Sequence, residues 1–428
     1  MAHIQTSFAY GNGPFSRAID LIIDYNNVRE KNGLPRLQSV FPLVPSYQFK
    51  GKEPGSRQIQ FMKETIDDTG GSQFLKEHPD EFILDIVQGE ILERVLYTGS
   101  NYEDSLRKIL ANSEKANVDL LKRFEQGKTK LKNLNDEEIE IDLRDAEIEF
   151  MFNNRVATNH RNSFYVNIGA GYFYEVLERA LSFPEVAVDK ELIKRIIPLA
   201  KKMTSYQKIH FLSDPGVFSY DSGRSRKKET EISTPPHMHF PKLDKTDLPK
   251  EGLYVVVTGI QGIAESGIYN VASEMGLQLY SGDDAFNVKY QGIKHPPFKV
   301  ANPKIKAQIA RTGWSSVWGI HMLAEVGLNT GLVYPQHLST DDPEILMNNK
   351  SVKKLDLGVE IDPKNPKNSL EEAIKLAQNN NKFNAELKRA YGTLNGFAYM
   401  ADTIFKYEQK QLKEVEKRKA ITPVSSYY

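Results

Sequence analysis

The fold class of this 428-residue chain is decided by the stretch Ile309-Ala310-Arg311-Thr312-Gly313-Trp314-Ser315-Ser316. A short strand ends at a turn that contains Gly313, and a helix is predicted to follow at residues 315–326. A strand, a turn and a helix in this order are typical of a parallel α/β domain. Such a turn directs backbone N–H groups and the positive end of the helix to one place, which favours an anion.

Two more polar turns are predicted at the same edge of the sheet. They follow the apolar strands predicted at residues 253–257 and 331–334. The residues of these turns that we assign to the candidate site are Thr258, Gly259, Gly262, Asp341, Asp342 and Glu344. Because the carboxyl ends of parallel strands meet at one edge, where open α/β sheets bind ligands, the three turns are expected to converge. Packing alone gives a second reading, in which Ser315 is a helix cap and Trp314 a core residue.

From about residue 252 to residue 360 the chain resembles the donor-binding half of glycosyltransferases with the GT-B fold. The matching pieces are Gly313-Trp314 with Ser316, Tyr334-Pro335, Asp341-Asp342 with Glu344, Asn348-Asn349 and Leu357-Gly358. The segment is similar to the UDP-glycosyltransferases and, more distantly, to the peptidoglycan N-acetylglucosaminyltransferase. The resemblance implies an α/β architecture of two facing Rossmann-like domains, with a C-terminal helix that packs back on the N-terminal domain.

The resemblance also implies a role for each turn. The donor diphosphate would be held by Gly313, Trp314, Ser315 and Ser316. The acidic residues at 341–344 would contact hydroxyls of the donor sugar, and the turn at 258–262 would approach the phosphates. Two positions depart from the family pattern. Arg311 replaces the histidine of plant-type members and could pair with phosphate. Gly319 replaces the ribose-binding glutamate, and His321 and Glu325 are nearby in the sequence but not at the position of that glutamate.

The N-terminal half is expected to bind the acceptor. A strand at residues 4–10, a turn and a helix at 15–28 begin a second α/β domain, in which the turn supplies the cleft residues Gly11, Gly13 and Arg17. Asn12 occupies the place where these enzymes often carry a general-base histidine, and an amide cannot take a proton at neutral pH. Asn12 could therefore orient an acceptor hydroxyl, whereas an ordinary tight turn would bind nothing here.

An inverting transfer to a hydroxyl needs a base near the acceptor, whereas a retaining mechanism needs no side-chain base of this kind. His160 and Asp214 are the candidate bases, and both also read as ordinary loop residues. His237 and His239 resemble a pair of metal ligands, but no carboxylate or third histidine follows at the spacing of a metal site. An incidental pair is therefore the better interpretation. Asp283-Asp284 is likewise interpreted as a turn. We therefore expect no bound metal and no cofactor.

The remaining pattern predicts other elements and the domain boundaries. Helices are expected at residues 81–96, 102–124, 191–203 and 384–418, and a strand at 138–143. Residues 126–136 are interpreted as a solvated helix end or a loop, and residues 221–250 as a linker or a long active-site loop. We expect an acceptor-binding domain at residues 1–243, a nucleotide-sugar-binding domain at 244–383 and a helical segment at 384–428.

The composition restricts the partners of the chain. Its 56 basic residues are balanced by 56 acidic ones, so the net charge predicts no nucleic-acid partner. The absence of cysteine excludes disulfides and thiolate metal sites and fits a reducing compartment. Neither a signal peptide nor an apolar run of about 20 residues is present, so we expect a cytoplasmic protein. An amphipathic helix could still contact a membrane surface.

These observations together predict a glycosyltransferase. It would move a hexose from a nucleoside-diphosphate sugar, UDP-linked on the strength of the resemblance, to a hydroxyl of a small molecule, glycan or lipid. Two alternatives stay open at this stage: a nucleotide-sugar epimerase of similar fold, and a non-catalytic nucleotide-sugar-binding protein, which the amide at Asn12 would suit.

Overall fold

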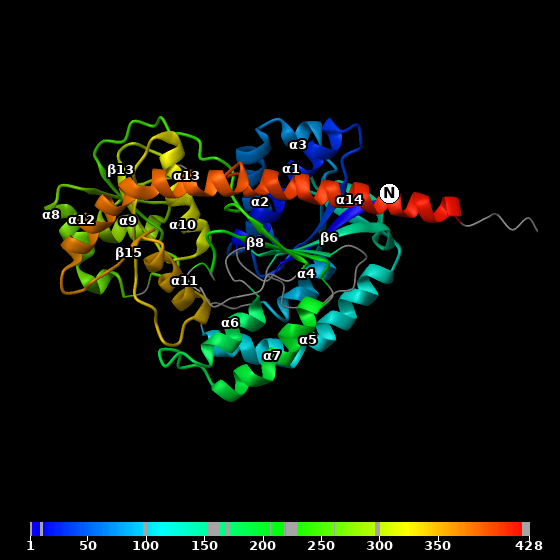
Figure 1. Ribbon diagram of the computed structural model, residues 1–428, viewed down its shortest axis with the longest axis horizontal. Coiled ribbons are helices and arrows are strands. Elements are labelled where there is room, and N and C mark those ends of the chain that lie inside the picture. Colours follow the sequence, from blue (N-terminus) through cyan, green and yellow to red (C-terminus); the bar gives the residue numbers. More distant parts are fainter. Residues whose placement is uncertain are drawn as a thin grey trace, which may run out of the picture.

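The computed structural model has two lobes, which the long helix α14 (Gly396–Ile421) crosses between (Figure 1). It describes residues 2–8, 12–96, 101–152, 163–167, 172–205, 207–217, 219, 229–260, 262–295 and 300–421. Each lobe is built on its own sheet. Within the described ranges, no helix is long and apolar enough to cross a membrane.

The N-terminal lobe contains a nine-stranded sheet in the order β5-β4-β3-β2-β1-β6-β7-β8-β9. Its strands are β1 (His3–Phe8), β2 (Gln38–Pro42), β3 (Phe82–Asp85), β4 (Lys128–Asn133), β5 (Glu138–Asp142), β6 (Ala146–Phe152), β7 (Ser163–Asn167), β8 (Ile209–Ser213) and β9 (Glu231–Thr234). Strands β3, β2, β1, β6, β7, β8 and β9 pair in parallel, whereas β4 and β5 form an antiparallel edge. In register, His3 on β1 pairs with Gln38 on β2.

Helices cover both faces of this sheet. They are α1 (Asn12–Lys31), α2 (Ser56–Gly70), α3 (Phe74–Glu77), α4 (Ile86–Glu93), α5 (Tyr102–Glu125), α6 (Phe173–Ala180) and α7 (Lys190–Ser205). Helices α1 and α2 lie on the side of α14, and α5, α6 and α7 lie on the opposite side (Figure 1). Because the two layers are separated by the sheet, each has its own apolar core.

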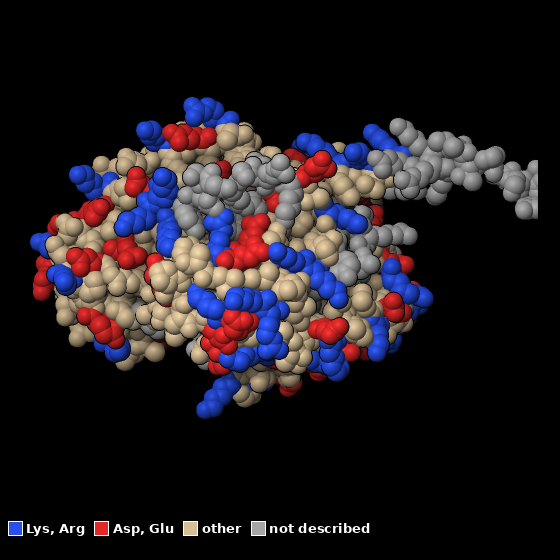
Figure 2. Space-filling view, turned by 60° about the horizontal axis from the view of Figure 1, so that its bottom comes forward, with Lys and Arg blue, Asp and Glu red and all other residues tan. Residues whose placement is uncertain are grey.

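The outer surface of the α5–α7 layer carries both signs of charge. Figure 2 shows Lys and Arg side chains among Asp and Glu on this face. On α7, Lys194 lies 2.7 Å from Glu191, and Lys201 lies 2.6 Å from Glu178 on α6. The layer therefore presents paired charges rather than a continuous basic surface, in agreement with the balanced composition.

The C-terminal lobe contains a six-stranded parallel sheet in the order β12-β11-β10-β13-β14-β15. Its strands are β10 (Gly252–Val255), β11 (Gln278–Ser281), β12 (Ile293–Lys294), β13 (Ile305–Ile309), β14 (Gly331–Tyr334) and β15 (Val359–Glu360). Its helices are α8 (Ile268–Glu274), α9 (Asp284–Tyr290), α10 (Trp314–His321), α11 (Pro343–Lys354), α12 (Pro366–Leu376) and α13 (Asn380–Tyr391). Central strands such as β10 are buried over their whole length, which explains their uninterrupted apolar sequence.

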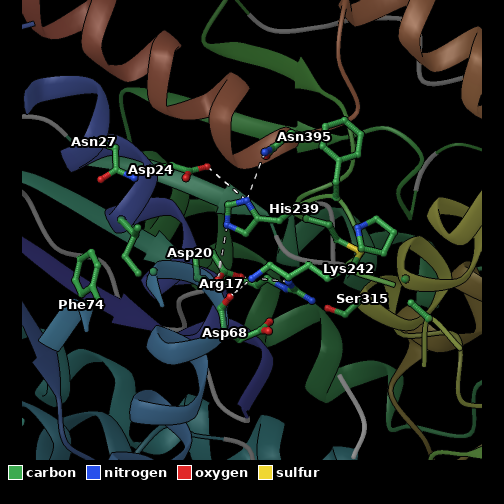
Figure 3. Close-up of a pocket in the computed structure, with 18 of the residues that line it drawn as sticks. Arg17, Asp20, Asp24, Asn27, Asp68, Phe74, His239, Lys242, Ser315 and Asn395 are labelled. Atoms are coloured by element: carbon green, nitrogen blue, oxygen red, sulfur yellow. Dashed lines mark hydrogen bonds and ion pairs between the residues drawn. The ribbon is translucent and has the colours of Figure 1, made fainter. Parts of the chain in front are cut away.

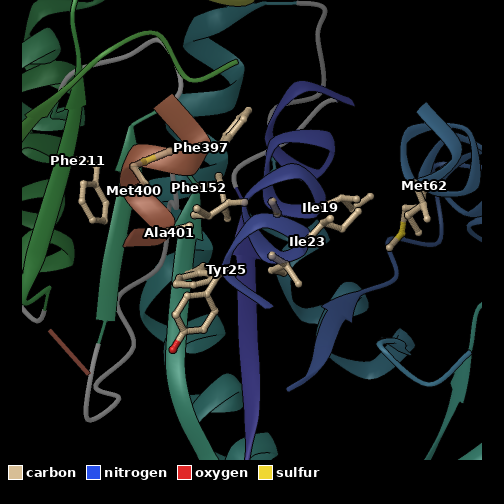
Figure 4. Close-up of a cluster of buried hydrophobic side chains, with 14 of the residues drawn as sticks. Ile19, Ile23, Tyr25, Met62, Phe152, Phe211, Phe397, Met400 and Ala401 are labelled. Carbon is tan, nitrogen blue, oxygen red and sulfur yellow. The ribbon is translucent and has the colours of Figure 1, made fainter. Parts of the chain in front are cut away.

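The last helix packs on α1 of the N-terminal lobe, as the resemblance implied. Apolar side chains of α14, including Phe397 and Met400, are buried with those of α1 (Figure 4). A buried polar network adds to this contact: the Tyr25 hydroxyl donates to Glu408 Oε2 over 2.8 Å, and Arg29 pairs with the same carboxylate. The C-terminal helix therefore couples the two lobes.

The structure confirms the helices predicted at residues 102–124 and 191–203 and the strand predicted at 138–143, and it corrects two neighbouring predictions. The helix predicted at 81–96 is strand β3 followed by α4, because the run Phe82-Ile83-Leu84 is buried on both faces and has no helical period. The loop predicted at 126–136 contains β4. Its lysines pair across to β5, with Lys128 and Lys130 each 2.9 Å from a glutamate, so the partner strand stabilises a segment that looked only polar.

Two predictions near the lobe junction were also wrong in part. The loop predicted at 221–250 contains the edge strand β9, which pairs in parallel with β8. The helix predicted at 384–418 is two helices, α13 and α14. Gly392 ends α13 with a positive φ of 74°, and the Asn395 side chain caps α14 by accepting the N–H of Ala398 over 3.0 Å.

Candidate active site

The three polar turns lie side by side at one edge of the C-terminal sheet. Strand β13 pairs in parallel with β10 on one side and with β14 on the other. The turns at residues 258–260, 310–313 and 335–342 follow the carboxyl ends of these three strands. The predicted convergence is therefore present in the sheet order, and this edge is where open α/β sheets bind ligands.

Arg311 links all three turns. Its Nη2 donates to Asp341 Oδ1 over 2.8 Å, and the two side chains are 23% and 20% exposed. On the other side Arg311 packs over Gly259, where a Cβ atom would lie only 2.6 Å from Arg311 Cδ. Gly259 also has a φ of 72°, so glycine is required there for two reasons. The pairing holds a guanidinium at the edge of the sheet, where it can meet an anionic group.

The turn at the start of α10 is anchored from behind by α11. Thr312 Oγ1 donates to Asn349 Oδ1 over 2.5 Å, and Trp314 Nε1 donates to Asn348 Oδ1 over 2.8 Å. In front of the turn there is open space, since a Cβ atom on Gly313 would have no neighbour within 4 Å. A rigid turn with free space before a helix N-terminus is suited to an anion.

The structure distinguishes the roles of the predicted donor-binding residues. Trp314 is 1% exposed and stacks on Trp318, so only its backbone can face a ligand. Asp342 is 4% exposed and accepts the Glu344 N–H over 2.9 Å as the N-cap of α11. Asp341 is thus the acidic side chain with the greater access to the edge of the sheet.

A cavity of about 880 Å³ lies between α1, α10 and the segment that joins the two sheets (Figure 3). It brings together three residues predicted from distant parts of the sequence: Arg17 on α1, and Ser315 and Ser316 on α10. Gly319 and Leu323 continue the wall along α10 and the 3₁₀ turn that follows it. The cavity therefore connects the proposed diphosphate turn with the N-terminal lobe.

Several charged or polar residues of this cavity were not recognised as site residues in the sequence. They are Asp20, Asp24, His239, Lys242 and Asn395. Asp20 and Asp24 are one helical turn apart on α1, a spacing that also describes a solvated helix face. Arg17 pairs with Asp20 at 3.3 Å, and burial raises the pKa of Asp24 to about 6. A raised carboxyl pKa in a cavity is a signal that only the fold provides.

The other candidate bases and acceptor residues divide into three groups. Gly11 and His160 lie outside the described residues. Asn12 and Gly13 begin α1, the helix that carries the cavity residue Arg17. Asp214 accepts a hydrogen bond from the Tyr391 hydroxyl over 3.0 Å, which ties the end of β8 to α13.

The two histidines of the possible metal pair have different surroundings. His237 is buried beside Trp318, and its Nε2 lies 2.7 Å from Thr234 Oγ1. His239 faces α1 and lines the cavity. Over the part of the chain that is described, no group of three or more metal-ligating side chains is found.

The remaining polar residues singled out from the sequence have structural partners. Asp283 caps α9 by accepting the Phe286 N–H over 2.7 Å, and Asp284 pairs with Lys294 at 3.0 Å. His321 and Glu325 both bond to Asn384 on α13, at 2.7 and 3.0 Å. Burial lowers the pKa of His321 to about 4, so this imidazole is neutral.

Neither a family model nor a curated protein matches this sequence. Solved structures do match. The glycotransferase of kitacinnamycin is 13% identical, with a TM-score of 0.53 over 95% of this chain and 98% of that one. The spinosyn rhamnosyltransferase SpnG complexed with thymidine diphosphate is 8% identical, with a TM-score of 0.51 over 94% of this chain and 99% of that one. The glycosyltransferase SnogD from Streptomyces nogalater is 9% identical, with a TM-score of 0.51 over 95% of this chain and 99% of that one. The likeness covers both lobes of each, and the protein has the GT-B glycosyltransferase fold.

Proposed function

We propose that this protein is a glycosyltransferase that moves a sugar from a nucleoside-diphosphate sugar to an acceptor hydroxyl. The observation that carries the proposal is that Arg311, in the turn that leads into α10, packs its side chain over Gly259 and pairs with Asp341. This guanidinium, the N-terminus of α10 and the hydroxyls of Ser315 and Ser316, which line the cavity, are groups that bind a diphosphate. Among the solved structures of this fold, one is complexed with thymidine diphosphate.

The proposed chemistry follows from this arrangement. As the bond between the sugar and the diphosphate breaks, negative charge develops on the leaving diphosphate. The α10 turn and Arg311 are fixed before the reaction, by Asn348, Asn349 and Asp341, so they can stabilise this charge without reorganising. Asp341 is proposed to contact the donor sugar.

We also propose the division of labour between the lobes. Residues 1–243 would bind the acceptor and residues 244–383 the donor, which we expect to be UDP-linked. The segment at 384–428 would join the two, since α13 packs on the C-terminal lobe and α14 on α1. Along the chain, β9 is the last strand of the first sheet and β10 is the first strand of the second, and the proposed boundary falls between them.

A thermal-shift screen of nucleotides and nucleotide sugars tests the donor site, because a bound ligand stabilises the folded state by mass action. Ser316→Ala and Gly313→Ala should reduce the shift. Gly313→Ala is a clean variant, because the new methyl group meets no protein atom within 4 Å and Gly313 has an ordinary φ of −62°. Ser182→Ala, in the exposed loop after α6, is the matched control and should retain the full shift.

The result distinguishes the alternatives. If no nucleoside diphosphate stabilises the wild type, the proposed function is wrong. If a nucleotide sugar binds but is never turned over with a broad panel of acceptors, a non-catalytic binding protein is the better interpretation. Release of nucleoside diphosphate that is fast without any acceptor would instead favour the elimination chemistry of an epimerase.

A further inference from the structure

A group of side chains in the cavity between α1 and α10 has no role in the proposed donor site. His239, on the segment that joins the two sheets, lies between two carboxylates of α1 (Figure 3). Its Nδ1 is 3.7 Å from Asp24 Oδ2, and its Nε2 is 3.9 Å from Asp20 Oδ1. Asn395, from the start of α14, approaches the same Nδ1 to 3.4 Å. Side chains from α1 and from the start of α14 therefore converge on one imidazole, which is carried by a third segment.

The two carboxylate separations are too long for direct hydrogen bonds. Within the described structure, neither His239 Nε2 nor Asp24 Oδ2 has a hydrogen-bond partner, although both atoms are buried. Burying an unsatisfied polar atom is costly, so these atoms need a partner that the protein does not supply. The Asp24 carboxylate is on the Nδ1 side of the ring and favours the tautomer with its proton on Nδ1, which leaves the Nε2 lone pair to accept a hydrogen bond from a hydroxyl group.

The rest of the cavity matches a ligand that carries several hydroxyls. Carboxylates accept hydrogen bonds on one wall, while Arg17 and Lys242 supply donors near Ser315. The rings of Phe74 and Phe240 add apolar surface. A volume of about 880 Å³ is large enough for a sugar unit beside the donor turn. Sugars combine hydroxyls with apolar C–H faces, which fits this lining.

We propose that the cavity holds a polyhydroxylated acceptor, such as a sugar unit of a glycan, and that His239 takes the proton of the attacking hydroxyl. This inference rests on the proposed function, because the α10 turn must hold the donor. The acceptor oxygen bonds to the anomeric carbon while the bond from that carbon to the diphosphate breaks. The nucleoside diphosphate leaves with the electron pair, and the hydroxyl proton moves to His239 Nε2. Asp24 and Asp20 then stabilise the imidazolium.

The assignment accounts for the amide at Asn12. A base after β1 is unnecessary if the base is on the segment between the sheets. His239 lies on the segment between β9 and β10, and its neighbour Asn395 lies between α13 and α14. Because both segments connect the two lobes, the position of His239 also depends on how the lobes are held together. His239 is the catalytic residue of the proposal, and Asp24 is a positioning residue that acts through it.

The test uses the full-length protein and the variants Asp24→Asn and His239→Gln. Asp67→Asn, on the exposed side of α2 and outside the cavity, is the matched control. Calorimetry with UDP, TDP and GDP measures donor-site binding. Release of nucleoside diphosphate from UDP-glucose, UDP-N-acetylglucosamine and TDP-glucose is then measured with cellobiose or lactose as polyol acceptor and with 4-methylumbelliferone as flat aromatic acceptor. Circular dichroism confirms that each variant is folded.

We expect a polyol to stimulate release in the wild type and in Asp67→Asn. Asp24→Asn and His239→Gln should lower the stimulated rate by about 100-fold or more, the usual contribution of a general base, with unchanged affinity for the nucleoside diphosphate. Stimulation by the aromatic acceptor alone, or wild-type rates in both variants, would overturn this inference and leave the proposed function standing. Binding without any turnover would overturn both. Failure of all three nucleoside diphosphates to bind would refute the proposed function first.

Discussion

Replacement of Asp24 by asparagine should stabilise the protein at neutral pH and leave its stability unchanged near pH 3.5. Burial is the main cause of the rise in the pKa of Asp24 from 3.8 to about 6. Asp20 and Asp402 raise it further, and His239 opposes the rise. Arg17, which faces the same side of α1, pairs with Asp20. Because the folded state holds this proton more tightly than the unfolded state, the group makes the protein less stable as the pH rises.

The sign and size of the effect follow from the two pKa values. Below pH 3.8 the carboxyl is protonated in both states and costs nothing. Between pH 3.8 and about 6 the unfolded state releases a proton that the folded state retains, so the free energy of unfolding falls with pH. The full difference corresponds to about 3 kcal/mol at neutral pH. The Asp24 side chain is 19% exposed, so little of this is removed by solvent screening.

Scanning calorimetry of the wild type and Asp24→Asn between pH 3.5 and pH 8 measures this difference. A gain of about 3 kcal/mol in a lobe of this size should raise the melting temperature by about 5 °C or more at pH 8, and the two curves should meet at low pH. Asp67→Asn, exposed on α2, should follow the wild type throughout. A difference that does not change with pH, or a lower stability of Asp24→Asn at pH 8, would refute the reasoning from burial. Confirmation would mean that the cavity keeps Asp24 at a cost in stability, as functional sites do.

Three further changes test other parts of the structure. Glu408→Gln leaves Arg29 without its buried partner and should cost about 3–5 kcal/mol, seen as a lower melting temperature and faster proteolysis of α14. Gly259→Ala places an alanine at a strained φ of 72° and pushes its methyl group against Arg311, so it should lower the free energy of unfolding by about 1–3 kcal/mol. It should also reduce the thermal shift with nucleoside diphosphates, and an unchanged shift would contradict the role of the turn. Asp341→Asn removes the ion pair that holds Arg311 and should weaken nucleotide-sugar binding about tenfold by calorimetry, whereas unchanged affinity would show that Arg311 needs no such anchor.

The sequence was most informative where local pattern and burial agree. The strand at β10 and the turn before α10 were identified because fully buried parallel strands are continuously apolar and because glycine and serine mark the turn that follows. Strand β4 was missed for the opposite reason. Its lysines are stabilised by glutamates of β5, and a cross-strand pair cannot be seen until the register is known.

In the candidate site, too, some features leave a local signal in the sequence and others depend on contacts between distant residues. The sequence by itself determined the α/β class and the three polar turns, since strand order and helix starts leave local signals in residue type and spacing. Only the tertiary structure decided which side chains act together. Arg311 bridges Gly259 and Asp341 because β10, β13 and β14 are neighbours. His239 lies beside Asp24 because the segment between the sheets passes over α1. These residues are far apart along the chain, and no local propensity brings them together; they meet only when burial of two separate sheets and the docking of α14 close the cavity between the lobes.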